Sequence, residues 1–451
     1  MADGTTTAEL DAPGDLVSVA DRLDGWLEEL DEPETLVEGR REAWERYREL
    51  PMPQTASEEW RYTDVEDLRP EDFGFVEPEA ARSVEIEDLP ATVQEVLAGE
   101  QDRSGVAVQV DAGEVYRRLD PELEEQGVVF APIVEVARER PELLEDRLFS
   151  SEVTDAEEKF WTLHRAIFSG GYLLYVPENV RVPEPVHAFR YLEREGAIVG
   201  SHTLVVAERG AEVTCVEEFL SPDLEETSLS VGGVEVFAGE NATVRYISLQ
   251  RYGRGVEHYS VQHATTGKDS HLSGFNVALG SDRHRADVTS HVEGPGSESE
   301  MLALWFGDGD QHIDHHTLQY HKAPHAYSDL LYKGALTDRG RSVFRGVIRV
   351  AQEAQLTDAY QTNRNLLLSE DSHANALPNL EIEADDVRCS HGATVGQVDE
   401  SQLFYLKSRG LTPLQAERLL VFGFFEEVLG RVPVEGVRSR VRSAIERKLG
   451  F

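Results

Sequence analysis

The spacing of hydrophobic positions changes twice along the chain and divides it into three regions. Up to residue 170, apolar residues recur at helical spacing, as in LVSVADRLDGWLEEL (16–30) and VEGRREAWERYREL (37–50). Beyond it, short β-rich runs such as GYLLYVP, HTLVVAE and SVFRGVIRV alternate with Gly, Asp, Asn and Ser turns. After Val398 the helical spacing returns. We therefore predict a mainly helical N-terminal region (1–170), a β core (171–398) and a C-terminal helical domain (399–451).

Helix-capping residues support both boundaries. Thr154 and Glu157 form a capping-box pattern before FWTLHRAIF, which stops at a pair of glycines. In the C-terminal region, Thr412, Pro413 and Gln415 supply an N-cap, a first-turn proline and a boxed glutamine. We expect this compact C-terminal unit to offer an apolar face for docking a partner.

The β core contains a small recurring unit, Ala-x-Val or Ala-x-Leu, which begins at Ala211, Ala242, Ala286, Ala354 and Ala393. We predict that each copy starts a new strand. The irregular spacing is compatible with a stack of β coils, and equally with a sandwich or a barrel.

The net charge is strongly negative, with 85 acidic against 43 basic residues and a formal charge of −42. Such a field repels nucleic acid and anionic membranes, so we expect neither as a partner. Only six of the basic residues are lysines, and the acidic residues are spread along the whole chain. This composition indicates a halophilic protein, because concentrated salt shortens the Debye length to about 3 Å at 1 M and screens the self-repulsion.

The sequence also predicts a cytoplasmic protein that does not span a membrane. The N-terminus is acidic and lacks the apolar core of a secretory signal. The longest apolar run, 419–425, is much shorter than the about 20 residues that cross a bilayer. Cys215 and Cys389, the two cysteines, form neither a CxxC motif nor a disulfide framework, which suits a reducing compartment.

One candidate site is Cys389 with His391, in the extended stretch RCSHGATVGQ. Positions i and i+2 of a strand share a face, so the thiol and the imidazole should point the same way. Together they could bind a soft or borderline metal, or act as nucleophile and base. The alternative is a cysteine packed as a small hydrophobe beside a histidine at a strand end.

A second candidate is the histidine-rich segment DGDQHIDHHTLQYHKAPHAYSD. Its histidines are His312, His315, His316, His321 and His325. Strand alternation would align the first and third of these with Asp314 as a metal cluster. A sheet can equally display such histidines on a solvated face.

Several common catalytic motifs do not occur in the sequence. There is no GxxxxGK[ST] phosphate loop, no GxGxxG and no GxSxG. Two cysteines cannot supply the four thiolates of a typical iron–sulfur cluster. Any cluster held here would need other ligands or another subunit.

Four segments resemble the SufB/SufD family of iron–sulfur cluster assembly proteins. They are EEWRYTD (58–64), the run 314–336 beginning DHHTLQYHKAPHAYSD, the run 344–387 beginning FRGVIRVAQEAQ, and RCSHGATVGQVDESQLFYLKSRGL (388–411). Within the family the match is to the SufD branch. SufB carries a cysteine where this chain has Leu406, which argues against the sulfur-accepting SufB role.

The resemblance implies a right-handed parallel β-helix core between an N-terminal helical region and a C-terminal helical domain. It also implies pairing with SufB through the β-helix, and a SufC ATPase docked on the C-terminal helices. ATP would then enter only through SufC. The family complex is associated with a reduced flavin, for which no motif is readable here. A homodimer is a further possibility.

The same resemblance implies that Cys389 and His391 belong to a transient iron–sulfur cluster site shared with SufB. On this interpretation the protein is a non-catalytic scaffold that helps to bring in iron, and the histidine-rich segment is structural. The alternative is a stand-alone β-solenoid or cupin-like metalloenzyme that uses the segment 312–325, with His312 and His316 as metal ligands.

Overall fold

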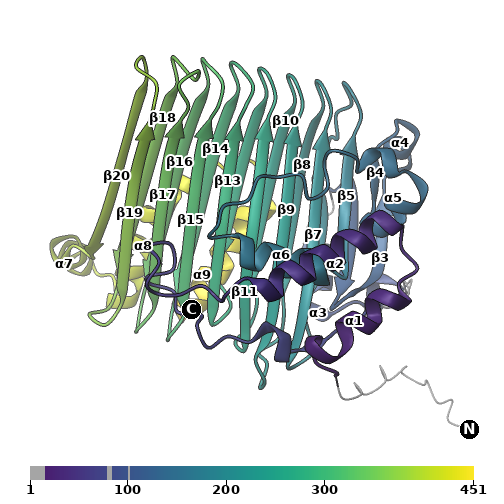
Figure 1. Cartoon of the computed structure of the whole chain (residues 1–451). Coiled ribbons are helices and arrows are strands. Elements are labelled where there is room, and N and C mark those ends of the chain that lie inside the picture. Colours follow the sequence, from purple (N-terminus) through teal and green to yellow (C-terminus); the bar gives the residue numbers. More distant parts are fainter. Residues whose placement is uncertain (1–15, 79–83, 100–101, 451) are drawn as a thin grey trace, which may run out of the picture.

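The centre of the molecule is a parallel β-solenoid in which the chain runs alternately through two sheets (Figure 1). The computed structural model describes residues 16–78, 84–99 and 102–450. Between residues 170 and 397, eight coils follow one another, each an odd-numbered strand and the next even-numbered strand. The parallel β-helix core is therefore confirmed, and the sandwich and barrel alternatives are wrong.

The odd-numbered strands of the coils form most of sheet A, and the even-numbered strands form most of sheet B. Sheet A contains β5 (Gly170–Val176), β7 (Ala197–Ala207), β9 (Ser228–Ala238), β11 (Val256–Thr266), β13 (Arg283–Val292), β15 (His312–His321), β17 (Arg341–Val350) and β19 (His373–Ile382). Sheet B contains β6 (Val186–Tyr191), β8 (Glu212–Leu220), β10 (Thr243–Arg251), β12 (His271–Ala278), β14 (Glu298–Gly307), β16 (Tyr327–Leu336), β18 (Asp358–Leu367) and β20 (Arg388–Gln397).

The recurring Ala-x-Val unit does not mark the coils. Ala211 and Ala242 directly precede β8 and β10, as predicted, but Ala286 and Ala393 lie inside β13 and β20. Parallel stacking places the coils in register through their backbone hydrogen bonds, so coil length can vary at the turns and no fixed sequence period is needed.

The N-terminal region mixes helices and short strands. Its elements are α1 (Val19–Glu29), α2 (Glu34–Glu49), η1 (Pro70–Asp72), β1 (Gly74–Phe75), η2 (Ile86–Asp88), α3 (Ala91–Gly99), β2 (Gly105–Val110), β3 (Gly113–Leu119), α4 (Pro121–Glu125), β4 (Val129–Pro132), α5 (Ile133–Glu139), η3 (Pro141–Leu143) and α6 (Glu158–Ile167). Helices α1, α2 and α6 lie on the outer face of sheet A (Figure 1), where Trp44, Trp60 and Phe160 bury their rings with Tyr259 of β11.

The two ends of the solenoid differ. At the N-terminal end, β3 pairs antiparallel with β2, and β4 pairs antiparallel with β5. Both sheets therefore end there in short strands that run against the solenoid. At the other end, β19 and β20 each have a strand neighbour on one side only among the residues that the structure describes. The side chains of β20 are mostly exposed, so the last coil is an open end.

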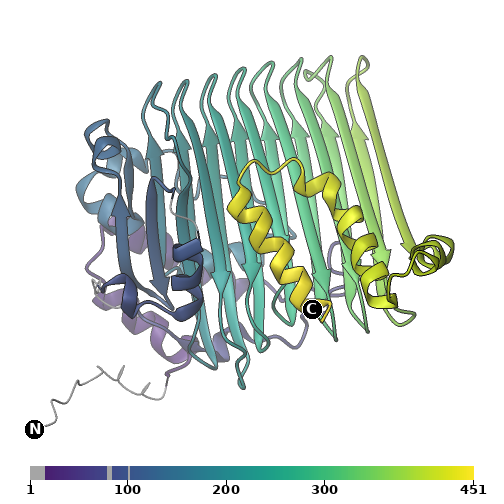
Figure 2. The ribbon, with the colours of Figure 1, turned by 180° about the vertical axis from the view of Figure 1, so that it is seen from behind.

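The C-terminal helices are α7 (Glu400–Ser408), α8 (Pro413–Leu429) and α9 (Glu435–Lys448). Thr412 and Gln415 form the predicted capping box at the start of α8. Helices α8 and α9 lie on the outer face of sheet B (Figure 2). Phe425 of α8 is fully buried there in a cluster with Leu304 and Leu331. The apolar face expected to dock a partner is thus largely covered by the protein's own sheet.

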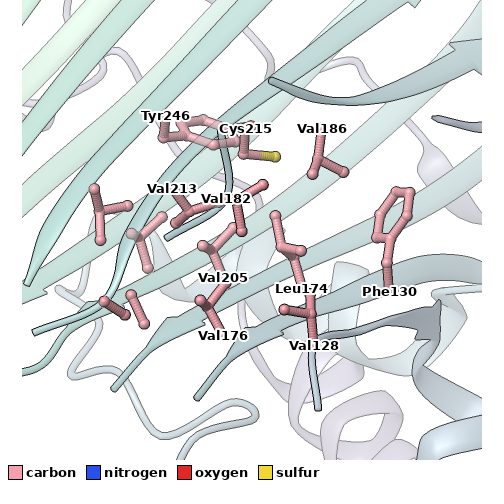
Figure 3. Close-up of a cluster of buried hydrophobic side chains, with 14 of the residues drawn as sticks. Val128, Phe130, Leu174, Val176, Val182, Val186, Val205, Val213, Cys215 and Tyr246 are labelled. Carbon is pink, nitrogen blue, oxygen red and sulfur yellow. The ribbon is translucent and has the colours of Figure 1, made fainter. Parts of the chain in front are cut away.

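The space between the sheets is filled by inward side chains. In the first coils it is mostly apolar, and Val186, Val205, Val213 and Cys215 point into one cluster (Figure 3). No helix in the described residues is long and apolar enough to cross a bilayer.

Candidate functional site: the open end of the solenoid

Cys389 and His391 lie on β20, the last strand of the solenoid. The parallel register sets Cys389 beside Ala359 and His391 beside Gln361 of β18. Ala359 and Gln361 are buried inward residues, so Cys389 and His391 continue an inward row at the open end. The prediction that both residues lie in one strand agrees with this register.

The two side chains have different surroundings. Cys389 is half-buried against Ile348, Val350 and Ala359, and burial followed by the charge of Asp358 raises the pKa of its thiol. His391 is exposed. The two Cα atoms are separated by two strand residues, roughly 6.6 Å. A thiolate and an imidazole at this spacing could both reach one iron centre and leave its other coordination positions to ligands from elsewhere.

The other cysteine is unsuited to that chemistry. Cys215 is buried in the apolar cluster of the first coils, and burial raises the pKa of its thiol. Since Cys215 is almost fully buried among apolar side chains, its sulfur packs as a small hydrophobe.

The histidine-rich segment is divided between two faces of β15. His315 and His321 point inward and are buried; His315 stacks on Trp305 of sheet B, and His321 lies 2.8 Å from Ser328 Oγ. His312 and His316 point outward beside Asp314. His325 lies in the turn after the strand with a positive φ of 61°.

The outward face of this segment is covered by the 58–64 segment and is not solvated. Thr63 donates a hydrogen bond of 2.5 Å to Asp314 Oδ2, and its hydroxyl oxygen lies 2.8 Å from His312 Nε2. His316 Nε2 lies 3.1 Å from Asp314 Oδ1. These contacts already occupy His312, Asp314 and His316, the three side chains that a metal cluster would require.

A buried arginine that the sequence did not single out completes this network. Arg285 of β13 binds Asp287 through two nitrogens, at 2.8 and 2.9 Å, and Asp314 at 3.1 Å. Its guanidinium lies 3.7 Å from the centre of the Trp60 ring. Burial alone would raise the pKa of Asp314, but the charges of His316 and Arg285 hold it well below its usual range. The network therefore fastens the N-terminal segment to sheet A.

Within the part of the chain that the structure describes, no three His, Cys, Asp or Glu side chains are arranged to hold a metal ion. Cys389 and His391 remain two candidate ligands on the mostly exposed last strand, and we call this pair the half-site.

The fold defines a class: β-solenoid proteins with one open end. Comparison with known proteins specifies the family. Residues 190–424 match the family described as SUF system FeS cluster assembly, SufBD core domain, and residues 27–188 match the SufBD protein N-terminal region. The chain belongs to the SufBD family.

Individual relatives agree over most of the chain. It is 33% identical over 433 residues to the iron–sulfur cluster assembly protein SufD of Bacillus subtilis, covering 95% of this chain and 97% of the relative. It is 28% identical over 413 residues to an iron–sulfur cluster assembly SufBD family protein of Staphylococcus haemolyticus, covering 90% and 87%. The chain is therefore SufD-like, as the resemblance of its C-terminal segment predicted.

Proposed function

We propose that this protein is the scaffold subunit of a cytoplasmic SufBCD complex, and that it contributes Cys389 and His391 to a nascent iron–sulfur cluster shared with SufB. The observation that carries the proposal is the position of these two residues on the last strand of an open-ended solenoid. The cluster is the cargo of the complex, and this chain does not catalyse a reaction by itself.

The open end suits a second solenoid. The outer edge of a terminal strand presents unpaired backbone groups, which readily pair with another chain. Val395, on the same strand face as the half-site, is 44% exposed. A partner solenoid stacked on β19 and β20 would cover this residue and bring its own ligands to Cys389 and His391.

ATP enters the proposed complex through SufC, docked on the C-terminal helical domain. Support comes from α7, which projects beyond the last coil (Figure 1) and exposes Phe404 by 72% and Tyr405 by 56%. Contiguous exposed apolar side chains of this kind mark protein interfaces. Reduced flavin is part of the proposal only at the level of the whole complex, since the sequence contains no GxGxxG motif.

The proposal is tested by anaerobic reconstitution with SufB and SufC, with iron content and visible absorption as readouts. We expect Cys389→Ser and His391→Ala each to lower bound iron severalfold. Ser390→Ala, between the two on the opposite strand face, and His373→Ala, an exposed histidine on β19, are the controls and should behave like wild type. Wild-type spectra for both site variants would refute the shared site.

Pairing is tested separately by co-purification. Val395→Lys places a charge in the proposed interface and should abolish capture of SufB, while Ile86→Lys, at a distant exposed position, should not. A chain that captures neither SufB nor SufC, and instead pairs with itself, would contradict the complex.

A further inference from the structure

Gln361 of β18 is the buried residue that lies directly behind the half-site. Strand alternation gives it the same inward face as Ala359, and the register makes it the neighbour of His391 across the last strand pair. Adjacent strands are about 4.8 Å apart, within reach of a glutamine side chain. Only 1% of Gln361 is exposed.

The Gln361 carboxamide has no hydrogen-bond partner among the described residues, at either its nitrogen or its oxygen. The next inward residues of the same strand are satisfied: Asn363 donates to Tyr332 O at 3.3 Å, and Asn365 donates to Asn363 Oδ1 at 2.7 Å. Leaving a buried polar group unpaired destabilises the folded protein. Among the inward amides of β18, the unpaired one is thus the one next to His391.

The opposite sheet leaves room for this side chain. Gly346 of β17 faces Gln361 across the interior, and any side chain at that position would collide with the Gln361 amide nitrogen. In the first coils, the interior Arg190 Nε donates to Glu217 Oε1 at 2.8 Å. An unpaired group retained at such a position requires an explanation beyond packing.

We infer that Gln361 is a positioning residue for His391, whose ring N–H its carboxamide oxygen accepts when a partner covers the open end. A histidine that binds metal through one ring nitrogen almost always donates the other N–H to an acceptor, which fixes its tautomer and orientation. Gln361 offers that acceptor without adding a charge. The inference rests on the proposed function, in which His391 binds iron.

The test uses Gln361→Met, which keeps the length of the side chain and removes both polar atoms. In the reconstituted complex, we expect iron to bind about 10–100-fold more weakly and the visible spectrum to change. The unfolding midpoint should be unchanged or higher, because an unpaired polar group has been removed. Gln319→Met is the matched control: Gln319 is also a buried inward glutamine, but it lies on β15 and donates to Ser328 Oγ at 2.7 Å. It should bind iron like wild type.

The double variant distinguishes positioning from a general effect on folding. If Gln361 acts through His391, His391→Ala with Gln361→Met should bind iron no more weakly than His391→Ala alone. Additive losses, or wild-type iron binding by Gln361→Met when His391→Ala is defective, would overturn the inference. If Gln361→Met fails to fold, Gln361→Glu is tested in its place, because its carboxylate retains the acceptor oxygen. We expect this variant to bind iron like wild type. Loss of iron binding by Gln361→Glu would overturn the inference. If the proposed function is wrong, the result differs, because His391→Ala would then itself bind iron like wild type.

Discussion

At the residue scale, Arg285 shows how one side chain joins two regions that are distant in sequence. It is 1% exposed, pairs with two buried carboxylates and covers the ring of Trp60. Its attraction to the carboxylates offsets the cost of burying three charges, so removal of the cation leaves His316 as the remaining ion-pair partner of the two buried anions.

We therefore expect Arg285→Ala to lower the free energy of unfolding by about 3–5 kcal/mol, measured by urea denaturation. The control is Arg339→Ala. Arg339 pairs with Asp310, but both side chains are about two-thirds exposed, so its loss should change the free energy of unfolding little. Equal effects of the two variants would show that the buried network adds nothing.

The residue scale also shows where sequence reasoning reaches its limit. Cys389 and His391 could be placed on one face because the period of a strand is two, which is a local property. The pairing of His391 with Gln361 depends on the register between β18 and β20, which their turn and the rest of the stack determine. The covering of His312 depends on Thr63, which lies about 250 positions earlier in the chain. No local pattern indicates either relationship.

At the element scale, helix α8 attaches the C-terminal helices to the solenoid. Phe425 is fully buried between α8 and sheet B. On the same face, Lys333 of β16 donates to Phe424 O at 2.8 Å and pairs with Glu427. The helices therefore dock through one apolar cluster with a buried ammonium beside it.

Phe425→Ala should cost about 3–5 kcal/mol of docking energy and release α8 and α9 while the solenoid remains folded. Hydrogen exchange should then rise in residues 413–448 and stay slow in the coils. Phe404→Ala is the control, because Phe404 is exposed on α7: it should leave exchange unchanged and weaken only the binding of SufC. Unfolding of the whole chain by Phe425→Ala would show that helices and solenoid are one cooperative unit.

The elements themselves were largely predictable, and their stacking was not. The capping residues Thr412 and Gln415 marked the start of α8 correctly, because a cap acts within a few residues. The β-rich runs marked strands for the same reason. Whether those strands stack, sandwich or close into a barrel depends on long-range pairing, and only the family resemblance indicated the solenoid.

At the scale of the whole molecule, buried histidines make stability depend on pH. Burial lowers the pKa of five of them to about 4, and they are His187, His263, His291, His315 and His321. The unfolded chain takes up these protons near pH 6.5, so between pH 4 and 6.5 it binds more protons than the folded protein. The contribution of these histidines to the free energy of unfolding should therefore be fully present above pH 6.5 and fall as the pH drops toward 4.

Each such histidine contributes up to about 1.4 kcal/mol per pH unit in this window. Urea midpoints measured between pH 7.5 and 5 should show the fall in stability. The slope of the free energy of unfolding against pH corresponds to the number of protons taken up on unfolding, and His315→Gln should reduce that number by about one. His271→Gln, which changes an exposed histidine, should leave the slope as it is. A midpoint that stays constant down to pH 5 would contradict buried neutral histidines.

Net charge acts on the whole molecule as well. With a formal −42, repulsion among surface carboxylates opposes folding, and salt screens it. We expect the unfolding temperature to rise between 0.1 and 2 M KCl, measured by circular dichroism. A flat dependence would refute the prediction that this composition is an adaptation to salt.

The unlike ends of the solenoid set an upper limit on assembly size. A strand stack with two similar ends can add copies indefinitely and grow into a fibre. Here β3 and β4 run against the stack at one end, β4 is only four residues long, and its last residue is a proline, which cannot donate to a ladder. We therefore expect growth to be favoured at the β19–β20 end. Once two solenoids meet through that end, neither offers another, and polymerisation stops at a pair.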